Sequence, residues 1–467
     1  MYVRKGRCSA SAPRGVGTIH HVAMMLWLCV GGAWAQTPPE EERSSPSAQP
    51  PSSAVPETTP TQSSVVTLPT IQVSPPPKTS AGREKPAQTA EQNAPPSPYE
   101  SGAPNVGGGA PVQPSAASQL TVSGAQVNAV PFSRPGEALE VVSGLIITQH
   151  SGEGKANQYF LRGYNLDHGT DLAITYDDVP MNMPTHAHGQ GYADLNMLIP
   201  ELISSVNIRK GPYYADVGDF GSVGAVSINL RDTVPQKVAQ FTLGSFGYGR
   251  FLGYGSTAVG PGNLLYAAEA ATYNGPWTNP DDMRKFNGLV RYSQGSNLNG
   301  FTVTGLAYSN KWNSTDQIPL RAITSGQLGL YDAFDPTDGG NASRFSLSGR
   351  FAQTDDSGAW LANAYAVKSK LDLYNNFTYF LTDPVNGDQF HQHDDRVLVG
   401  GNVSRMFNGS FGSLPTETTF GLQSWYNNID TLTDPPPGLS RDASLREISS
   451  LGKALLFFQV QVLPRHN

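Results

Sequence analysis

Metal-donor side chains of two kinds stand at alternating positions in one short stretch of the sequence. Met181 pairs in this way with Met183, and His186 with His188. Residues two apart in an extended segment face the same way, so each pair can present both of its donors on one side. Thioether and imidazole together suit copper, whereas imidazole with a carboxylate suits zinc or a ferric chelate. The stretch therefore predicts a metal-related site, with His186 and His188 as the candidate ligands.

Carboxylates and further imidazoles lie close by in the sequence. Asp167 and Asp171 precede the stretch, and His150 stands further upstream. No His-x-x-His motif, cysteine or carboxylate cluster completes the site, so an alternative stays open. In that alternative, the stretch forms hydrogen bonds within its own domain or holds an organic ligand. His391 and His393 fall in an expected outer loop, where we expect them to be solvated.

The sequence carries no pattern for covalent chemistry. G-x-S-x-G, H-E-x-x-H and G-x-x-x-x-G-K-[ST] motifs are all missing, so an enzyme is the least expected class and no cofactor is expected. The net charge of −7, with 15% charged residues and no basic stripe, argues against a nucleic-acid partner. The 49 glycines, together with 19 tyrosines and 19 phenylalanines, favour β-structure with many turns.

Residues 1–35 have the layout of an export signal. A basic start is followed by an apolar run at 22–30 and by the small-residue cleavage pattern Ala33-Trp34-Ala35. The apolar run is too short to cross a bilayer as a helix. Both cysteines, Cys8 and Cys29, lie in this signal. The mature chain is therefore expected to use neither disulfides nor cysteine-ligated metals.

Residues 36–118 are rich in Pro, Ser and Thr and contain a single aromatic residue, Tyr99. Such a segment cannot bury enough apolar surface to offset its ordering entropy, so we expect a disordered tether. One short β-prone stretch interrupts it. The stretch consists of Leu68, Pro69, Thr70, Ile71, Gln72, Val73 and Ser74. An extended, unpaired segment on a loose tether is what strand addition to a partner's sheet edge requires.

Residues 119–233 predict a compact α+β domain. Strand-like runs occur at 144–149, 171–176, 204–209 and 224–230, and short helical patterns at 135–142 and 195–202. Residues 234–467 instead predict about ten antiparallel strands of roughly ten residues, the length that tilted transmembrane strands need. Short turns alternate with long connections, as in an up-and-down membrane barrel.

The clearest strand alternates apolar and polar residues, which predicts one face toward lipid and one toward a polar lumen. Its apolar side is formed by Phe345, Leu347, Gly349 and Phe351, and its polar side by Arg344, Ser346, Ser348 and Arg350. A soluble β-sandwich is the alternative fold. Residues 451–467 lose this alternation and lack the terminal aromatic residue of outer-membrane strands, so we expect a prematurely stopped or frameshifted end and an incomplete barrel.

Four segments in order resemble the plug domain of TonB-dependent outer-membrane receptors. The apolar-Arg-Gly element is at 158–164, a strand ending in Asp-Asp-Val-Pro at 174–180, a basic-Gly-Pro turn at 206–212, and a Gly-rich element at 216–229. Asp178 stands where the family usually has Gly, and Asp tolerates a left-handed turn. The residues that the resemblance marks as plug-stabilising are Arg162, Gly163, Asp177, Lys210, Gly211, Pro212, Gly221 and Gly224.

The resemblance also identifies residues 68–74 as a TonB box and places two loops at the outer, substrate-facing side of the plug. The candidate ligand-binding residues in these loops are Asp167, His168, Asp171, Met181, Met183, His186, His188 and Tyr192. It implies plug-gated uptake of a scarce substrate, such as a ferric siderophore or metal complex, into a Gram-negative cell. The alternatives are a non-transporting fragment and a receptor for copper ions, zinc ions or a non-metal ligand.

The partners implied are the TonB C-terminal domain, outer-membrane lipid, the barrel-assembly machinery and a small-molecule or metal-chelate substrate. Receptors of this kind close with about 22 strands. About ten strands cannot enclose a plug of this size, so the resemblance also predicts an open, curved sheet that wraps part of the way round the plug.

Overall fold

The structure, a computed structural model, describes residues 119–149, 152–381, 383–385, 387–434 and 445–462. The expected export signal, tether and TonB box, and also His150, lie outside these residues. Among the described residues, no helix is both long enough and apolar enough to cross a lipid bilayer.

A five-stranded sheet forms the centre of the plug, with strand order β1-β7-β8-β5-β6. Its strands are β1 (Gln119–Ser123), β5 (Leu172–Tyr176), β6 (Val179–Pro180), β7 (Ile203–Lys210) and β8 (Gly224–Leu230). β5 and β8 run parallel, and the other neighbours run antiparallel. A second, three-stranded sheet consists of β2 (Leu145–Thr148), β3 (Gln158–Leu161) and β4 (Tyr164–Asn165).

Three short helices complete the plug: α1 (Gly124–Val127) and the 3-10 helices η1 (Pro135–Val141) and η2 (Pro200–Leu202). α1 begins where the Ser123 hydroxyl accepts the Gln126 amide hydrogen, a reciprocal cap. The helical pattern expected at 195–202 was wrong except for its last turn. Pro200 can begin a helical turn but has no N–H to continue an earlier one, so helix forms only from that residue onward.

The plug core lies between the two sheets and is almost fully shielded from solvent. Tyr159, Leu195, Leu198 and Ile203 each have no measurable exposure. Each such side chain stabilises the fold by roughly 1.5–3 kcal/mol relative to leaving it exposed. The Tyr159 hydroxyl donates to the Ala193 carbonyl at 2.9 Å, so the one polar atom buried with this ring is satisfied.

The remaining chain forms one ten-stranded antiparallel sheet in which each strand pairs with the next in sequence. The strands are β9 (Val238–Leu243), β10 (Gly249–Val259), β11 (Gly262–Tyr273), β12 (Met283–Gly295), β13 (Gly300–Asn313), β14 (Gly339–Asp355), β15 (Gly358–Asn375), β16 (Phe390–Phe411), β17 (Leu414–Asp434) and β18 (Leu445–Val462). An α+β domain followed by about ten antiparallel strands is thus confirmed.

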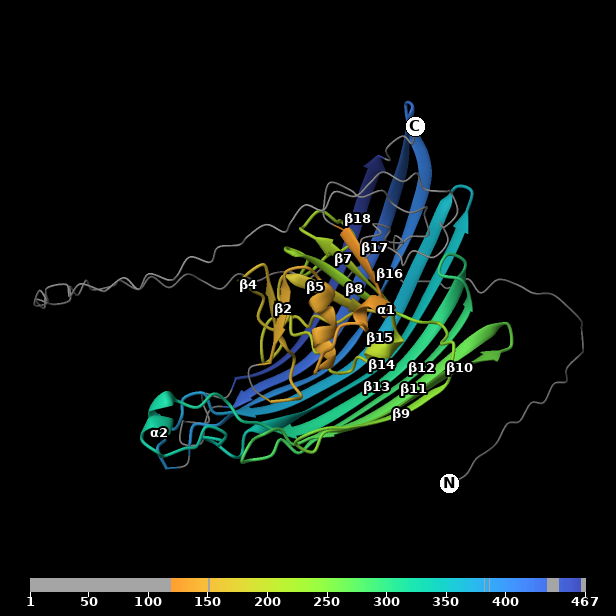
Figure 1. Cartoon of the computed structure of the whole chain (residues 1–467). Helices are drawn as coiled ribbons and strands as arrows, with labels where there is room; N and C mark the ends of the chain where they lie inside the picture. The colour runs from red at the N-terminus through yellow and green to blue at the C-terminus, as the bar shows by residue number, and fades with distance from the viewer. Residues whose placement is uncertain (1–118, 150–151, 382, 386, 435–444, 463–467) are drawn as a thin grey trace, which may run out of the picture. The chain divides into compact units, whose positions relative to one another are not determined.

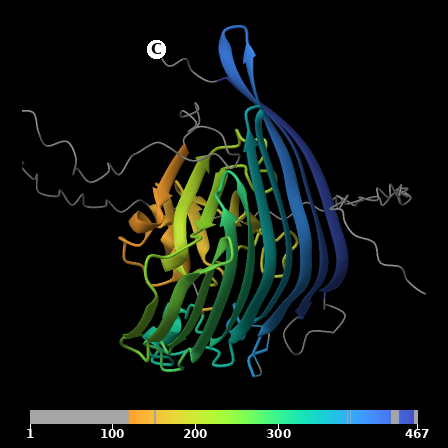
Figure 2. The ribbon, with the colours of Figure 1, turned by 90° about the vertical axis from the view of Figure 1, so that its right-hand side faces the viewer.

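The sheet curves around the plug, which lies against its concave face (Figures 1 and 2). Within the described residues, β9 and β18 are its two edges. The short turns gather at one end. The long connections gather at the other, where helix α2 (Leu320–Thr324) lies (Figure 1). Several strands far exceed the expected ten residues. β16 reaches 22, because it pairs with β15 over residues 390–407 and with β17 over residues 391–411.

The two faces of the sheet differ as the alternation in β14 predicts. Phe345, Leu347 and Phe351 are 52%, 60% and 45% exposed on the convex face, while Arg344 is 4% exposed on the other. A convex face of bare apolar side chains around a polar interior is the pattern of a membrane barrel rather than of a soluble sandwich, whose second sheet would cover that face.

Two expectations for the last strands were wrong. His391 and His393 belong to β16 and not to a loop, because pairing with β15 already begins at Phe390. The end of the chain also keeps its alternation. In β18, Leu456 is 80% and Phe458 57% exposed, whereas Leu455 and Phe457 turn toward the plug. The backbone pleat alternates whatever the side chains are, so apolar residues on both faces hid the pattern.

Candidate functional site

Ion pairs join the plug to the concave face of the sheet. The Arg291 guanidinium of β12, with 3% of its side chain exposed, contacts the Asp177 carboxylate and donates to Asp232 at 2.9 Å. Arg350 of β14 reaches Asp178 at 3.2 Å. Charges buried in this way are costly unless paired, so these contacts hold the plug in one position.

The turn that carries Asp177 and Asp178 depends on left-handed backbone, with φ of +51° and +66°. Asp is one of the few residues with a side chain that adopts this region at modest cost. The turn between β5 and β6 thereby presents two adjacent carboxylates, one to Arg291 and the other to Arg350. Asp178, where the family usually has Gly, therefore adds an ion pair between the plug and Arg350 of the sheet and still allows the turn.

The other residues expected to stabilise the plug lie in or beside turns. Arg162 and Gly163 form the left-handed corner between β3 and β4, with φ of +53° and +84°. The Lys210 ammonium donates to the Ser143 carbonyl at 2.8 Å. The turn that follows contains Gly211 and Pro212, and Gly221 and Gly224 belong to the Gly-rich segment leading into β8.

Three imidazoles from the two candidate loops converge on Tyr192. His186 stacks on the Tyr192 ring with centroids 4.1 Å apart and an interplanar angle of 1°. His188 meets the same ring edge-on at 5.7 Å, and His168 lies 5.9 Å from it. The Tyr192 hydroxyl accepts the Ala156 amide hydrogen at 2.9 Å. The structure thus brings four of the eight predicted ligand residues into one cluster.

Hydrogen bonds fix the tautomers of two of these rings. His168 Nδ1 lies 3.0 and 3.1 Å from the carbonyls of Ala156 and Asn157, which can only accept, so this nitrogen carries a hydrogen. His188 Nδ1 lies 2.8 Å from Gln392 Oε1. The Gln392 amide is oriented by donating to the Ala187 carbonyl at 2.7 Å, so His188 Nδ1 must also donate. In their neutral forms, both rings therefore keep a lone pair on Nε2.

Those two Nε2 atoms face each other at 3.1 Å. Two lone pairs at this distance repel unless a proton or a metal ion lies between them. Two imidazole nitrogens on a tetrahedral zinc, with Zn–N bonds of about 2.0–2.1 Å, stand about 3.3 Å apart. Asp167 Oδ1, on a half-exposed side chain, lies 3.7 Å from His168 Nε2.

His186 is not part of this donor pair. Its Nδ1 accepts the backbone amide hydrogen of His188 at 3.1 Å, so the neutral ring carries its hydrogen on Nε2, which faces Asp394 at 3.7 Å. Asp394 and Arg396 of β16 close the cluster from the sheet side. The Arg396 guanidinium donates to the carbonyls of Pro184 and Thr185 at 2.8 and 3.0 Å.

Burial keeps the cluster uncharged at neutral pH. Desolvation lowers the pKa of His186 to about 4. Desolvation also lowers the pKa of His188 well below its usual range, with the Lys155 ammonium and His168 adding to the effect. The pKa of His168 falls for the same first reason. Lys155 itself is buried, and its pKa is lowered to about 8 by desolvation. A proton is therefore disfavoured between the two facing Nε2 atoms.

Of the other predicted ligand residues, Asp167 and Met183 border the cluster. Met181 is packed in the apolar plug core at 1% exposure. Met183, at 5% exposure, lines a small cavity together with His186. The Asp171 carboxylate accepts a hydrogen bond from the Ser222 hydroxyl. The thioethers and imidazoles thus do not form one donor set. The alternation of residues 181–188 was readable from the sequence, but a β-bridge between Met183 and Tyr192 turns this stretch inward.

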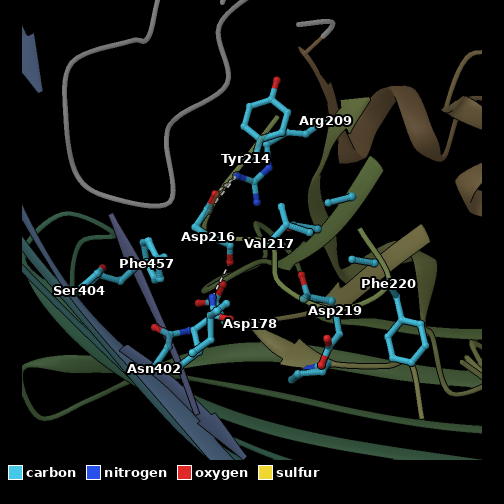
Figure 3. A pocket seen from close by; sticks show the side chains of 18 of the residues that line it. Asp178, Arg209, Tyr214, Asp216, Val217, Asp219, Phe220, Asn402, Ser404 and Phe457 are labelled. Carbon is cyan, nitrogen blue, oxygen red and sulfur yellow. Dashed lines mark hydrogen bonds and ion pairs between the residues drawn. The ribbon is translucent and has the colours of Figure 1, made fainter. Parts of the chain in front are cut away.

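A larger cavity of about 770 Å³ lies between the plug and β15–β18 (Figure 3). From the plug side it is lined by the segment 213–220, where Arg209 binds Asp216 at 2.8 Å and its guanidinium lies 4.9 Å from the Tyr214 ring. From the sheet side, Asn402, Ser404 and Phe457 face it. Among the described residues its lining contains no histidine, so it is separate from the imidazole cluster. Nothing in the sequence pattern indicated this cavity.

Comparison with known proteins decides what the plug is. Residues 111–225 match a family model described as the TonB-dependent receptor plug domain. Residues 111–225 are therefore a plug domain of the TonB-dependent receptor type. The matched segment includes the histidine cluster and the Asp177–Asp178 turn.

Solved structures share the fold of the chain at low sequence identity. The ferric citrate transporter FecA, unliganded, has a TM-score of 0.57 at 12% identity, covering 74% of this chain and 54% of its own. The ferric preacinetobactin receptor BauA from Acinetobacter baumannii has 0.56 at 11%, covering 78% and 58%. The copper transporter OprC has 0.54 at 15%, covering 75% and 52%. The chain spans about half the length of these structures.

Proposed function

We propose that the chain acts in TonB-dependent uptake of a scarce substrate, a ferric siderophore or another metal complex, across the outer membrane of a Gram-negative bacterium. The observation that carries this proposal is the plug seated on the concave face of a sheet whose convex face is apolar. Among the described residues, the plug belongs to none of the wall's hydrogen-bonded strand pairs and meets the wall through ion pairs and apolar side-chain contacts. Such a plug is a gate, because breaking those contacts opens a passage without unfolding the wall.

The contacts that hold the plug suggest how the gate would open. Arg291 and Arg350 on the sheet bind the neighbouring carboxylates Asp177 and Asp178 of a single plug turn. A pull on the N-terminal side of the plug would be transmitted through β1, which pairs with β7 along five residues. TonB would supply that pull by adding residues 68–74 to its own sheet edge. Once the plug moves, the cavity beside β15–β18 would give the substrate space to pass toward the short-turn end.

Peptide binding tests the TonB contact directly. A peptide of residues 64–76 is titrated into the TonB C-terminal domain, alongside an Ile71→Pro peptide and a Ser64→Pro control outside the box. Proline removes a backbone donor in the middle of the added strand, so Ile71→Pro should abolish binding while Ser64→Pro retains it. Equal binding by all three peptides would refute the box.

Transport by the whole chain requires a second measurement. The full chain is expressed in a Gram-negative host that lacks its own receptors, and uptake of radiolabelled iron from a panel of ferric siderophores is followed with and without TonB. TonB-dependent accumulation supports the proposal. Siderophore binding at the cell surface without accumulation would instead favour the alternative of a chain that binds but does not transport.

Direct binding of a metal ion is the second candidate function, and the facing Nε2 atoms of His168 and His188 favour it. The two facing donors are imidazoles with Asp167 close by, and neither is a thioether, so zinc fits better than copper(I). Zinc titration of the full chain should lose a site in His168→Gln/His188→Gln but not in His186→Gln, whose nitrogens are already engaged. If His168→Gln/His188→Gln and His186→Gln gave the same zinc isotherm, the facing pair would not bind zinc. The alternative that these loops hold an organic ligand would then be favoured.

A further inference from the structure

A second group of donor side chains lies on the convex face of the sheet, outside the plug and its cluster. Asp372 belongs to β15, and His391 and His393 belong to β16 (strands labelled in Figure 1). Asp394 and Arg396 of β16 contact the plug, so the odd-numbered residues of this strand face away from it. Asp372 is paired directly with His393 across the two strands and shares its face.

The three side chains converge closely. His391 Nε2 lies 3.1 Å and His393 Nδ1 lies 2.5 Å from the same oxygen, Asp372 Oδ1. One ligand atom from each residue lies within 4.8 Å of the others. The Tyr374 ring stacks on His391 at 4.4 Å and 7°, which restrains that imidazole. Each of the three side chains is between 12% and 22% exposed, so the group is open to small ions.

The spacing explains why these residues meet. Histidines two apart on a strand project to one side, and the residue directly opposite on an antiparallel neighbour has its Cβ about 4.5–5.5 Å away. His391 and His393 with Asp372 satisfy both relations. Two imidazoles and one carboxylate leave one position of a tetrahedral ion vacant, the ligand number of an open zinc site. Oxygen-preferring ions such as calcium would need more carboxylates.

The group lies just beyond the apolar part of the convex face. Next along β15 and β16, the Lys368 ammonium binds Asp395, and beyond this pair Val397 and Val399 are 39% and 40% exposed. Lys370 contacts Asp372 Oδ2 at 3.0 Å and leaves Oδ1 to the histidines. The group is therefore at the long-connection end, where the wall passes from lipid to water.

We propose that Asp372, His391 and His393 form a zinc site on the outward rim of the barrel wall. Because its ligands come from two strands, a bound ion would tie β15 to β16 near the start of the long connection between them. The proposal does not depend on TonB or on transport. It adds a site to the wall, separate from the plug.

The test uses the full chain in detergent, in a His168→Gln/His188→Gln background so that the plug pair cannot contribute. Zinc chloride is titrated by calorimetry. His391→Gln/His393→Gln and Asp372→Asn should each weaken binding by at least about tenfold, the lower end of the loss seen when even an outer-shell partner of a metal ligand is removed. The matched control is Lys368→Gln, which lies on the same face and should keep full affinity.

Two further readouts separate loss of the site from loss of folding. The parent protein here is the His168→Gln/His188→Gln background, and the trio variants are His391→Gln/His393→Gln and Asp372→Asn in that background. Cobalt(II) bound to the parent protein should give the intense visible absorption of a four-coordinate ion, and cobalt(II) added to either trio variant should not. Zinc should also slow amide hydrogen exchange at the paired ends of β15 and β16 in the parent and in Lys368→Gln, and in neither trio variant. Unchanged zinc affinity in the trio variants, or no zinc binding by the parent, would overturn the proposal.

Discussion

His168 and His188 face each other through their Nε2 atoms at 3.1 Å, although the Nδ1 atom of each ring already donates to an oxygen. This arrangement leaves two lone pairs opposed inside the plug and makes the region sensitive to protons as well as to metal ions. Neighbouring His186 is held neutral by burial and stacked on Tyr192.

Acid should therefore destabilise the plug through its buried histidines. The pKa of His186 is lowered to about 4 in the folded state, so the unfolded chain takes up a proton first as the pH falls below about 6.5. Stability is then lost between that value and the folded pKa, reaching about 2 kcal/mol at about pH 5 for this one residue. We expect the thermal midpoint of the full chain to fall over this range.

The variant His186→Gln should flatten that pH dependence, whereas the non-titrating variant Leu330→Ala, at an exposed residue in the connection between β13 and β14, should leave it unchanged. Scanning calorimetry from neutral pH to about pH 5 measures the effect. A thermal unfolding midpoint of the wild-type chain that does not change with pH would contradict this prediction. It would show that the histidines are already protonated in the folded plug or are hydrated enough to keep their ordinary pKa.

Removal of the Arg291 guanidinium should loosen the plug. Arg291→Gln leaves Asp177 and Asp232 without their cation in a region where the arginine is 3% exposed. Breaking a buried pair by deleting one partner costs about 3–5 kcal/mol. Amide hydrogen exchange in β5 and β6 should accelerate strongly.

Arg284→Gln is the matched control, because this arginine is 71% exposed and pairs only with the exposed Asp282. Exposed pairs contribute about 0–1 kcal/mol. Equal exchange rates in the plug of both variants would mean that Arg291 does not hold the gate.

Two glycines of the plug should respond differently to alanine. Gly163 has φ of +84° and open space around the position of a Cβ, so Gly163→Ala should cost only the backbone term of about 1–2 kcal/mol. At Gly224, with φ of +151°, a Cβ would meet the Arg209 carbonyl oxygen at 2.5 Å. Gly224→Ala should therefore destabilise the plug more. Urea unfolding of the two full-length variants, monitored by tyrosine fluorescence, compares them, and equal midpoints would contradict this reading.

A charge on the convex face should impair membrane assembly. Leu347 is 60% exposed and pairs with Ala366, in the apolar part of the wall. Lysine at the midplane of a barrel's lipid face costs about 2–4 kcal/mol. Leu347→Lys should lower the yield of folded protein in phospholipid vesicles, measured by protease protection. Leu330→Lys, 65% exposed in the connection between β13 and β14, should not. Equal yields would place Leu347 outside the lipid.

Local patterns in the sequence were enough to predict the class of fold. The alternation of Phe345, Leu347 and Phe351 gave the lipid-side face of β14, because successive side chains of a strand point to opposite faces whatever surrounds it. The segments around Arg162, Asp177 and Gly211 marked the plug for a similar reason, since tight turns restrict which residues can occupy them.

Only the tertiary structure decided which donors meet. His188 contacts His168, which is 20 residues away in the sequence, and Gln392, which is 204 residues away. No local periodicity of the sequence predicts contacts over such separations. The sequence placed Met181 beside the histidines, but packing sent its side chain into the core. His391 and His393 showed the same alternation as His186 and His188. They became a candidate site only when the register of β15 against β16 set Asp372 opposite them. Register depends on where every preceding turn closes, so one residue's difference would have turned both histidines toward the plug.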